Sequence, residues 1–450
     1  MHPQTQTQPR PRYRGHSTYQ KHTQPAYNHE YHIGHGPNHL GTVDAVTDAT
    51  TAKLKPYSLK SIALSRNPQR RQTSTQTLLS EIAHLKDLHH KHLTALIATF
   101  THEDPYNPTF GIVTAPLAEC DLEDYFGSFW DEKSKQYQAF AAGWFECLVS
   151  GLEYLHRNGV VHGRVKPRNI LVREGEVLFT DFGIERKRCE IKIKDPTGFG
   201  YEGYEGTSTG RVTVDYAAPE VLAQEFAART MTKTQALTAV AATTTQAADI
   251  FSLAAIFLEI LIVYLTPNAL DAFRARLAKT QASMTVGHKH KGDKANMHLS
   301  YSSQTTLAMR IVRGTVIGSG SPITGELNSV LDLCEEMLNT DPHARPTAAG
   351  LGWCWTYGHF LPPSSCGVTH YPWRYLPKAN AEPVIGTRIE TATASVLEQV
   401  LEAHEWAKAR AIVWLNKVPL HDGRLILQMA RDRNDKEVLK YLERNLINNF

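Results

Sequence analysis

The sequence predicts an α+β protein with a small β-rich N-terminal lobe and a larger, mainly helical lobe. Short β-like runs around a glycine-rich turn occupy the region from His32 to Ser65, a pattern typical of strands. Apolar residues then recur every three or four positions over 77–93, which predicts a single helix. The same helical spacing begins again at 139–159 and opens the second, larger half.

The predicted organisation follows from shifts in composition along the 450 residues. Residues 1–26 have almost no aliphatic side chains and cannot offset the entropy of ordering, so we expect a disordered tail. Two polar tracts lack a periodic apolar face over their whole length, which predicts loop insertions. The predicted boundaries are 27–360 for the main domain, about 27–114 for its N-lobe, 115–121 for a hinge, 122–360 for its C-lobe, 228–248 and 279–304 for the insertions, and 386–450 for a helical C-terminal region.

Composition and charge favour an intracellular protein, cytoplasmic or nuclear, without a nucleic-acid or membrane partner. The 48 Lys and Arg residues nearly balance 45 Asp and Glu, leaving a net charge of +3. The six cysteines show no C-x-x-C spacing, and residues 1–26 lack the apolar core of a signal peptide. The apolar run 250–265 carries Glu259 and is shorter than the roughly 20 residues needed to cross a bilayer, so it predicts a buried helix.

The stretch 160–186, VVHGRVKPRNILVREGEVLFTDFGIER, carries the strongest chemical signal. It resembles the catalytic loop of protein kinases, H-x-D-x-K-P-x-N, followed at short spacing by D-F-G. IGHGPNHLGTV, YSLK and SEIAHLKDLHH precede it, and TVDYAAPE, DIFSLA and DPHARP follow it, in the order of the kinase motifs. The chain is therefore similar to the eukaryotic protein kinase superfamily of serine/threonine type, which implies a bilobal protein-kinase fold with a C-terminal helical appendage.

The resemblance implies that the protein binds ATP and Mg²⁺. Lys60 matches the lysine that contacts the phosphates, and Glu81 matches the glutamate that holds this lysine by an ion pair. Asn169 and Asp181 match the ligands of Mg²⁺, a hard cation that prefers oxygen. The residues implied to contact the nucleotide are Gly34, Gly36, Gly41, Val43, Lys60, Glu81 and Ala118.

The glycine-rich turn departs from the kinase pattern. Glycines let backbone amides approach phosphates because no Cβ intervenes. Here four residues, including Pro37, separate Gly36 from Gly41, where kinases usually have two. The shape of the lid over the nucleotide therefore differs from the family pattern.

The catalytic position also departs from the pattern. The aspartate of H-x-D-x-K-P-x-N accepts the proton of the substrate hydroxyl, and Arg164 stands in its place, two residues before Lys166. An arginine offers only donors and cannot act as a general base. A positioned base contributes roughly 10²- to 10⁴-fold to the rate. By contrast, Glu220 and Arg345 match a buried ion pair of the kinase scaffold, which is intact in the sequence.

Three hypotheses follow from these residues. The first is a pseudokinase that binds nucleotide and acts as a scaffold or regulator for other proteins. The second is an active serine/threonine kinase with a non-standard catalytic loop, because phosphoryl transfer demands little covalent chemistry from the protein. The third is a helical interaction module at 386–450 carried on a kinase-like platform. The sequence does not identify the partner or the substrate.

Overall fold

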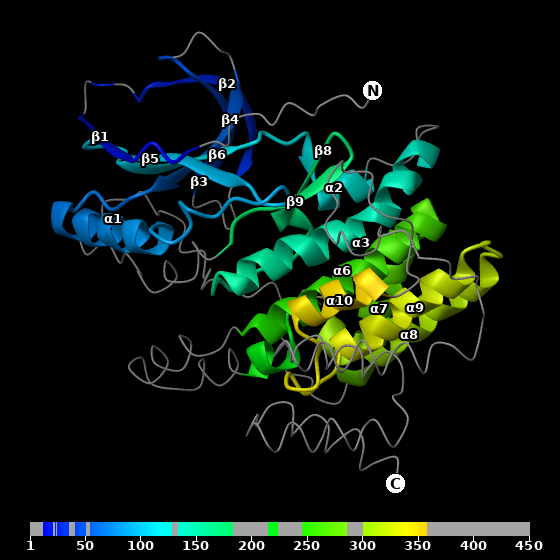
Figure 1. Cartoon of the computed structure of the whole chain (residues 1–450). Helices are drawn as coiled ribbons and strands as arrows, with labels where there is room; N and C mark the ends of the chain where they lie inside the picture. The colour runs from blue at the N-terminus through cyan, green and yellow to red at the C-terminus, as the bar shows by residue number, and fades with distance from the viewer. Residues whose placement is uncertain are drawn as a thin grey trace, which may run out of the picture. The chain divides into compact units, whose positions relative to one another are not determined.

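The computed structural model separates into two compact units (Figure 1). Unit 1 comprises Met1–Leu122 with Arg168–Arg211, and unit 2 comprises Glu123–Pro167 with Val212–Phe450. A β-rich N-terminal sheet and a helical C-terminal region confirm the predicted α+β class. The structure describes residues 12–20, 23, 25–35, 41–50, 55–127, 134–182, 215–223, 245–285 and 300–357.

Unit 1 contains a six-stranded sheet with the order β1-β5-β6-β4-β3-β2. Only β1 and β5 pair in parallel; the other pairs are antiparallel. Adjacent residues of a strand face opposite sides, so Ile112 belongs to one core cluster and Val113 to another. The strands are β1 (His16–Gln20), β2 (Tyr27–His35), β3 (Gly41–Asp48), β4 (Pro56–Ala63), β5 (Ala95–Glu103) and β6 (Thr109–Ala115).

Strand β1 corrects the prediction of a disordered tail over 1–26. His16–Gln20 pair with the β5 segment from Thr99 to Glu103, while residues 1–11 lie outside the described part of the chain. The polar composition of 1–26 did not indicate this strand, because β1 buries little of its own surface. Its residues gain backbone hydrogen bonds and aromatic contacts from a strand about 80 residues away in the sequence, which a local pattern cannot reveal.

Helix α1 (Pro68–Ile82) is the one α-helix that lies wholly within the described residues of unit 1, but it begins and ends earlier than 77–93. Asn67 caps it by accepting a hydrogen bond from the Arg70 amide, and Pro68 occupies the first turn, where its missing N–H costs nothing. The predicted continuation to residue 93 is wrong. Leu85 and Leu88 keep the apolar spacing because they are buried in turns that follow the helix.

A second, three-stranded sheet of unit 1 joins β7 (Cys120–Asp121), β8 (Ile170–Arg173) and β9 (Glu176–Phe179). The β8–β9 turn consists of Glu174 and Gly175, both with positive φ (51° and 78°), the conformation of a tight hairpin. His92 Nδ1 lies 2.7 Å from the Val177 carbonyl, which ties the segment before β5 to β9.

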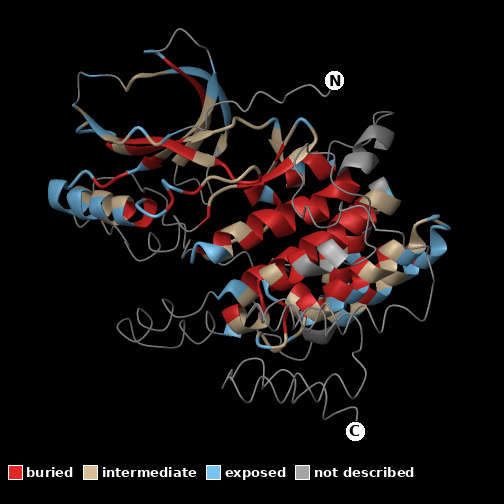
Figure 2. Ribbon diagram, in the orientation of Figure 1, coloured by how far each residue is buried: buried red, intermediate tan, exposed pale blue. Residues whose placement is uncertain are grey.

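Unit 2 is helical, and α6 (Gln246–Leu265) is its central helix. Every residue from Ala248 to Val263 is buried, as Figure 2 shows, which confirms the predicted buried helix. By length and composition alone α6 could cross a membrane, but 89% of the apolar window is covered by the protein itself. The other helices are α2 (Leu122–Gly127), α3 (Ser134–Arg157), α7 (Leu270–Thr285), α8 (Tyr301–Gly318), α9 (Thr324–Met337) and α10 (Ala348–Tyr357), with short turns η2 (Pro167–Asn169) and η4 (Pro267–Ala269).

The two predicted loop insertions are shorter than expected. Helix α6 begins inside the tract 228–248, while α7 ends and α8 begins inside the tract 279–304. Each tract therefore contributes helical residues at its margins. The rest of both tracts, and the whole region 386–450, lie outside the described residues.

Candidate nucleotide-binding and catalytic site

The predicted phosphate lysine forms an ion pair with the predicted metal ligand. Lys60 lies on β4, paired with Val43 of β3 and Ile112 of β6, and its ammonium Nζ donates to Asp181 Oδ2 at 2.8 Å. The side chains are 12% and 25% exposed, so both keep limited access to solvent. Unit 1 thus brings together a cation that suits phosphates and a carboxylate that suits Mg²⁺.

Asn169 and Asp181 lie at the open end of the β8–β9 hairpin. Ile170 pairs with Phe179, and the Thr180 amide donates to the Asn169 carbonyl at 3.0 Å, so the ladder places 169 beside 180. Asp181 follows with φ of 58°, a left-handed conformation that aspartate tolerates better than most residues and that often marks functional positions.

These two side chains suit Mg²⁺ chemically. They offer an amide and a carboxylate oxygen, and Mg²⁺ is usually held by one or two such groups together with nucleotide phosphates and water. Within the described ranges no group of three or more His, Cys, Asp or Glu side chains could hold a metal by itself. The residues present therefore fit a metal that arrives with a nucleotide.

Glu81, the predicted partner of Lys60, lies in the same unit. It is buried on α1, with 6% of its surface exposed. The Lys60–Glu81 ion pair stays a prediction. The contact with Asp181 was not predicted from the sequence, since residues 60 and 181 are 121 positions apart.

The glycine-rich turn is described at its two ends. Gly34 is the last residue but one of β2, and a Cβ added to it would meet open space, whereas a Cβ added to Gly41 would lie 1.9 Å from the Ser61 carbonyl oxygen. A glycine is therefore required at 41 by the close approach of β4. Gly36 and Pro37 lie outside the described residues.

The remaining predicted nucleotide contact, Ala118, lies half-buried between β6 and β7. The next residue, Glu119, donates its amide to the Val172 carbonyl of β8 at 3.1 Å, which fixes this connection to the second sheet. The predicted role of Ala118 in binding stays a prediction.

Residues 162–167 of the predicted catalytic loop belong to unit 2, where Asp249 of α6 holds their backbone. Asp249 is 1% exposed; its Oδ2 accepts the His162 amide at 2.8 Å, and its Oδ1 accepts the Gly163 amide at 2.7 Å. The Arg164 amide then donates to His162 Nδ1 at 3.3 Å. The side chains of Arg164 and Lys166 are both half-buried. The backbone on the N-terminal side of Arg164 is thus held by hydrogen bonds to a buried carboxylate of α6.

The predicted scaffold pair of unit 2 is confirmed. Arg345 is fully buried and donates to both Glu220 oxygens at 2.7 and 2.8 Å, and its guanidinium lies 5.1 Å from the Phe251 ring centre. Three backbone carbonyls, those of Asn339, Ala247 and Thr340, also accept hydrogen bonds from the guanidinium, which compensates for the cost of burying the charge.

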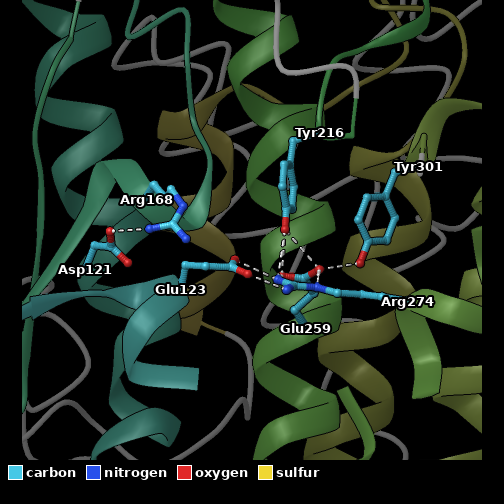
Figure 3. A network of polar contacts seen from close by, with 7 residues as sticks. All are labelled: Asp121, Glu123, Arg168, Tyr216, Glu259, Arg274 and Tyr301. Carbon is cyan, nitrogen blue, oxygen red and sulfur yellow. Dashed lines mark hydrogen bonds and ion pairs between the residues drawn. The ribbon is translucent and has the colours of Figure 1, made fainter. Parts of the chain in front are cut away.

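A larger polar network in unit 2 was not predicted (Figure 3). Glu259, the one carboxylate within the apolar run of α6, is 0% exposed and accepts hydrogen bonds from Tyr216, Tyr301 and Arg274. Arg274 of α7 also donates to both oxygens of Glu123 on α2, at 2.6 and 2.9 Å. One guanidinium therefore joins two carboxylates from two helices.

The electrostatics of this network follow from burial. Burial raises the pKa of Tyr216 and Tyr301 well above the ordinary value, and the adjacent Glu259 charge raises it further, so both are neutral donors. Burial alone would lower the pKa of Arg274, but its hydrogen bonds to Glu259 raise it, and the guanidinium stays charged. A charged residue within an otherwise apolar helical run, such as Glu259, predicts from the sequence alone that a buried polar or charged partner lies nearby.

The chain belongs to the protein kinase domain family, which matches residues 27–352. It is similar to mitogen-activated protein kinase 13 of Mus musculus, with 27% identity over 194 residues, 42% of this chain and 45% of that protein. It is also similar to cyclin-dependent kinase D-1 of Arabidopsis thaliana, with 30% identity over 148 residues, 32% of this chain and 34% of the relative.

Calcium-dependent protein kinase 4 of Plasmodium berghei (strain Anka) is 30% identical over 172 residues, 37% of this chain and 28% of the relative. The chain thus spans less than half the length of each of these three relatives. The family match establishes the family of this chain and agrees with its fold. The activity, the substrate and the partners are inferred from the residues of this chain.

Proposed function

We propose that this protein is a pseudokinase of the serine/threonine type: it binds ATP with Mg²⁺, transfers phosphate slowly or not at all, and acts inside the cell as a scaffold or regulator for another protein. The single observation that carries this proposal is Arg164. It occupies the position of the catalytic base in a loop whose backbone is still held by buried Asp249.

Arg164 cannot do the work of the base that it replaces. Its guanidinium has no acceptor and does not deprotonate in proteins, so it cannot take the proton of a hydroxyl nucleophile. Loss of a positioned base removes roughly 10²- to 10⁴-fold of rate. A cation at this position also attracts phosphate in the ground state, and binding of the ground state does not accelerate transfer.

The nucleotide side of the proposal rests on Lys60, Asn169 and Asp181. Lys60 supplies a cation for the phosphates, and Asn169 with Asp181 supplies oxygen ligands for the metal. Bound Mg²⁺ would neutralise phosphate charge. The Lys60–Asp181 contact keeps the cation and the carboxylate close together in unit 1.

An active kinase is the second candidate. Transfer of a phosphoryl group depends mainly on positioning and charge stabilisation, so a chain with its metal ligands in place could retain slow turnover. The third candidate, an interaction module at 386–450, involves residues outside the described part of the chain. Neither candidate requires a nucleic acid or a membrane.

Thermal shift tests the binding step. A ligand that binds only the folded state raises its stability, so ATP with Mg²⁺ should raise the Tm of the parent protein. Asp181→Ala should lose the part of this shift that depends on Mg²⁺, while Arg313→Ala, on the exposed side of α8, should keep it. Absence of any shift with the parent protein at saturating nucleotide would remove the binding claim.

Restoration tests the catalytic step. Arg164→Asp should raise phosphotransfer to a generic Ser/Thr peptide by roughly 10²- to 10⁴-fold over the parent, and a second change, Asp181→Ala, should abolish the gain. Arg313→Asp is the matched control, because it reverses a charge on α8 that is paired with exposed carboxylates, Asp332 and Glu335. Parent turnover of about 1 to 100 s⁻¹, the ordinary range of kinases, would refute the pseudokinase assignment.

A further inference from the structure

Strand β1 lies outside the part of the chain that matches the kinase family. The match begins at residue 27, whereas β1 covers His16–Gln20. In unit 1 this strand occupies the edge of the six-stranded sheet beside β5, which would otherwise present an unpaired edge (Figure 1). Open strand edges are ready templates for the addition of an extended segment.

Backbone hydrogen bonds hold the segment in a parallel register. The Arg14 amide donates to the Ile97 carbonyl at 2.7 Å, and the Thr99 amide donates to the Gly15 carbonyl at 3.2 Å. His16 then pairs with Thr99, and the register continues to Gln20. This pattern is the same one that a bound peptide uses when it adds a strand to a sheet.

Arg14 anchors the segment to the other strands of the sheet. Its guanidinium pairs with Asp48, the last residue of β3, which is 2% exposed, and donates to the Tyr57 hydroxyl of β4 at 3.2 Å. Asp48 also accepts two hydrogen bonds from Thr50. A buried carboxylate therefore faces the segment and selects a cation at position 14.

Aromatic side chains of the segment fit the face of the sheet. The His16 ring stacks on Phe110 with centroids 5.6 Å apart, and its Nδ1 lies 3.0 Å from the Thr99 hydroxyl. Tyr19 packs edge-on against Phe100 at 5.7 Å. Tyr13, at the start of the segment, forms a hydrogen bond of 2.9 Å with the same threonine.

The segment contributes little to the core in spite of these contacts. No residue of β1 is buried, whereas β5 is buried over most of its length. Local opening is easiest where few apolar groups are buried. The segment is therefore held at the edge of β5 mainly by polar contacts and ring contacts.

We propose that the β5 edge is a peptide-binding site, that residues 12–20 occupy it as a detachable internal strand, and that an extended peptide of a partner protein replaces them there. The contacts define the chemistry of the partner peptide. It would form a strand parallel to β5, with an arginine that pairs with Asp48 and aromatic rings that pack against Phe110 and Phe100. This site is independent of the nucleotide and of Arg164.

Hydrogen exchange on the full chain tests whether the strand detaches. The backbone amides of residues 16–20 should exchange faster than those of β5 and β6 in the parent protein. Arg14→Ala should increase their exchange by about 10- to 100-fold, because removal of a donor leaves the buried Asp48 less well satisfied. Exposed Arg12→Ala is the matched control and should leave exchange unchanged.

A labelled synthetic peptide of residues 12–20, RYRGHSTYQ, tests binding at the β5 edge itself. It should bind full-length Arg14→Ala saturably, and a peptide with Arg14→Ala should bind at least about tenfold more weakly, as loss of one charged hydrogen bond predicts. No saturable binding, or equal loosening of all strands in Arg14→Ala, would overturn the proposal. If that variant does not fold, equal exchange of β1 and β5 in the parent overturns it as well.

Discussion

Replacement of Arg274 by methionine tests the polar network of unit 2. In the parent, Arg274 joins Glu259, which is 0% exposed, to Glu123, which is 27% exposed. Removal of one member of a buried ion pair typically costs about 3–5 kcal/mol, because the other charge stays buried without its partner. Tyr216 and Tyr301 continue to donate to Glu259, so we expect the lower end, about 3 kcal/mol.

Arg313→Met supplies the comparison. Arg313 also joins two carboxylates, Asp332 and Glu335, but these are 68% and 66% exposed, and exposed pairs contribute about 0–1 kcal/mol. A change of 1 kcal/mol shifts Tm by about 2–4 °C in domains of this size. We therefore expect Arg274→Met to lower Tm by about 6–12 °C and Arg313→Met by less than about 4 °C.

Differential scanning fluorimetry and urea unfolding measure both variants. The combination of Arg274→Met with Glu259→Gln should recover part of the loss, since a neutral amide does not need a cation and still accepts from the tyrosines. Equal losses for Arg274→Met and Arg313→Met would show that the buried charge is not the source of the stability and would refute the reasoning.

Two further predictions concern unit 1. Gly41→Ala should lower the Tm, while Gly34→Ala should leave it nearly unchanged, because a Cβ meets the Ser61 carbonyl at 1.9 Å in the first case and open space in the second; similar melting curves would contradict this. Burial lowers the pKa of His16 below its usual value of about 6.5, so the unfolded chain binds the proton first as the pH falls, and the free energy of unfolding should decrease below about pH 6.5. His16→Phe keeps a ring against Phe110 and should remove this part of the pH dependence of Tm.

The sequence predicted the features that depend on local spacing or on motif order. The α+β class and the buried helix α6 both follow from periodicity, and both are confirmed. The Glu220–Arg345 pair was predicted because each residue belongs to a motif of the kinase family. Such features can be read from one segment at a time, or from a resemblance that already contains the long-range contact.

The features that were missed depend on contacts between distant segments. Strand β1 is stabilised by β5, about 80 residues away, so its own polar composition predicted a tail. Helix α1 was placed too late because Leu85 and Leu88 mimic a helical face, while the capping signal at Asn67 was passed over. The contact of Lys60 with Asp181 joins residues that no local pattern relates.

An arginine at position 164 is compatible with the fold because the loop is held by its backbone. Asp249 accepts the amides of His162 and Gly163, and the Arg164 amide donates to His162. None of these hydrogen bonds requires a particular side chain at 164, so the chemistry at this position can change while the loop keeps its conformation. For the same reason Arg164→Asp places a carboxylate on a loop that is already formed, and any gain in phosphotransfer from that variant reports the chemistry of the side chain rather than a repair of the fold.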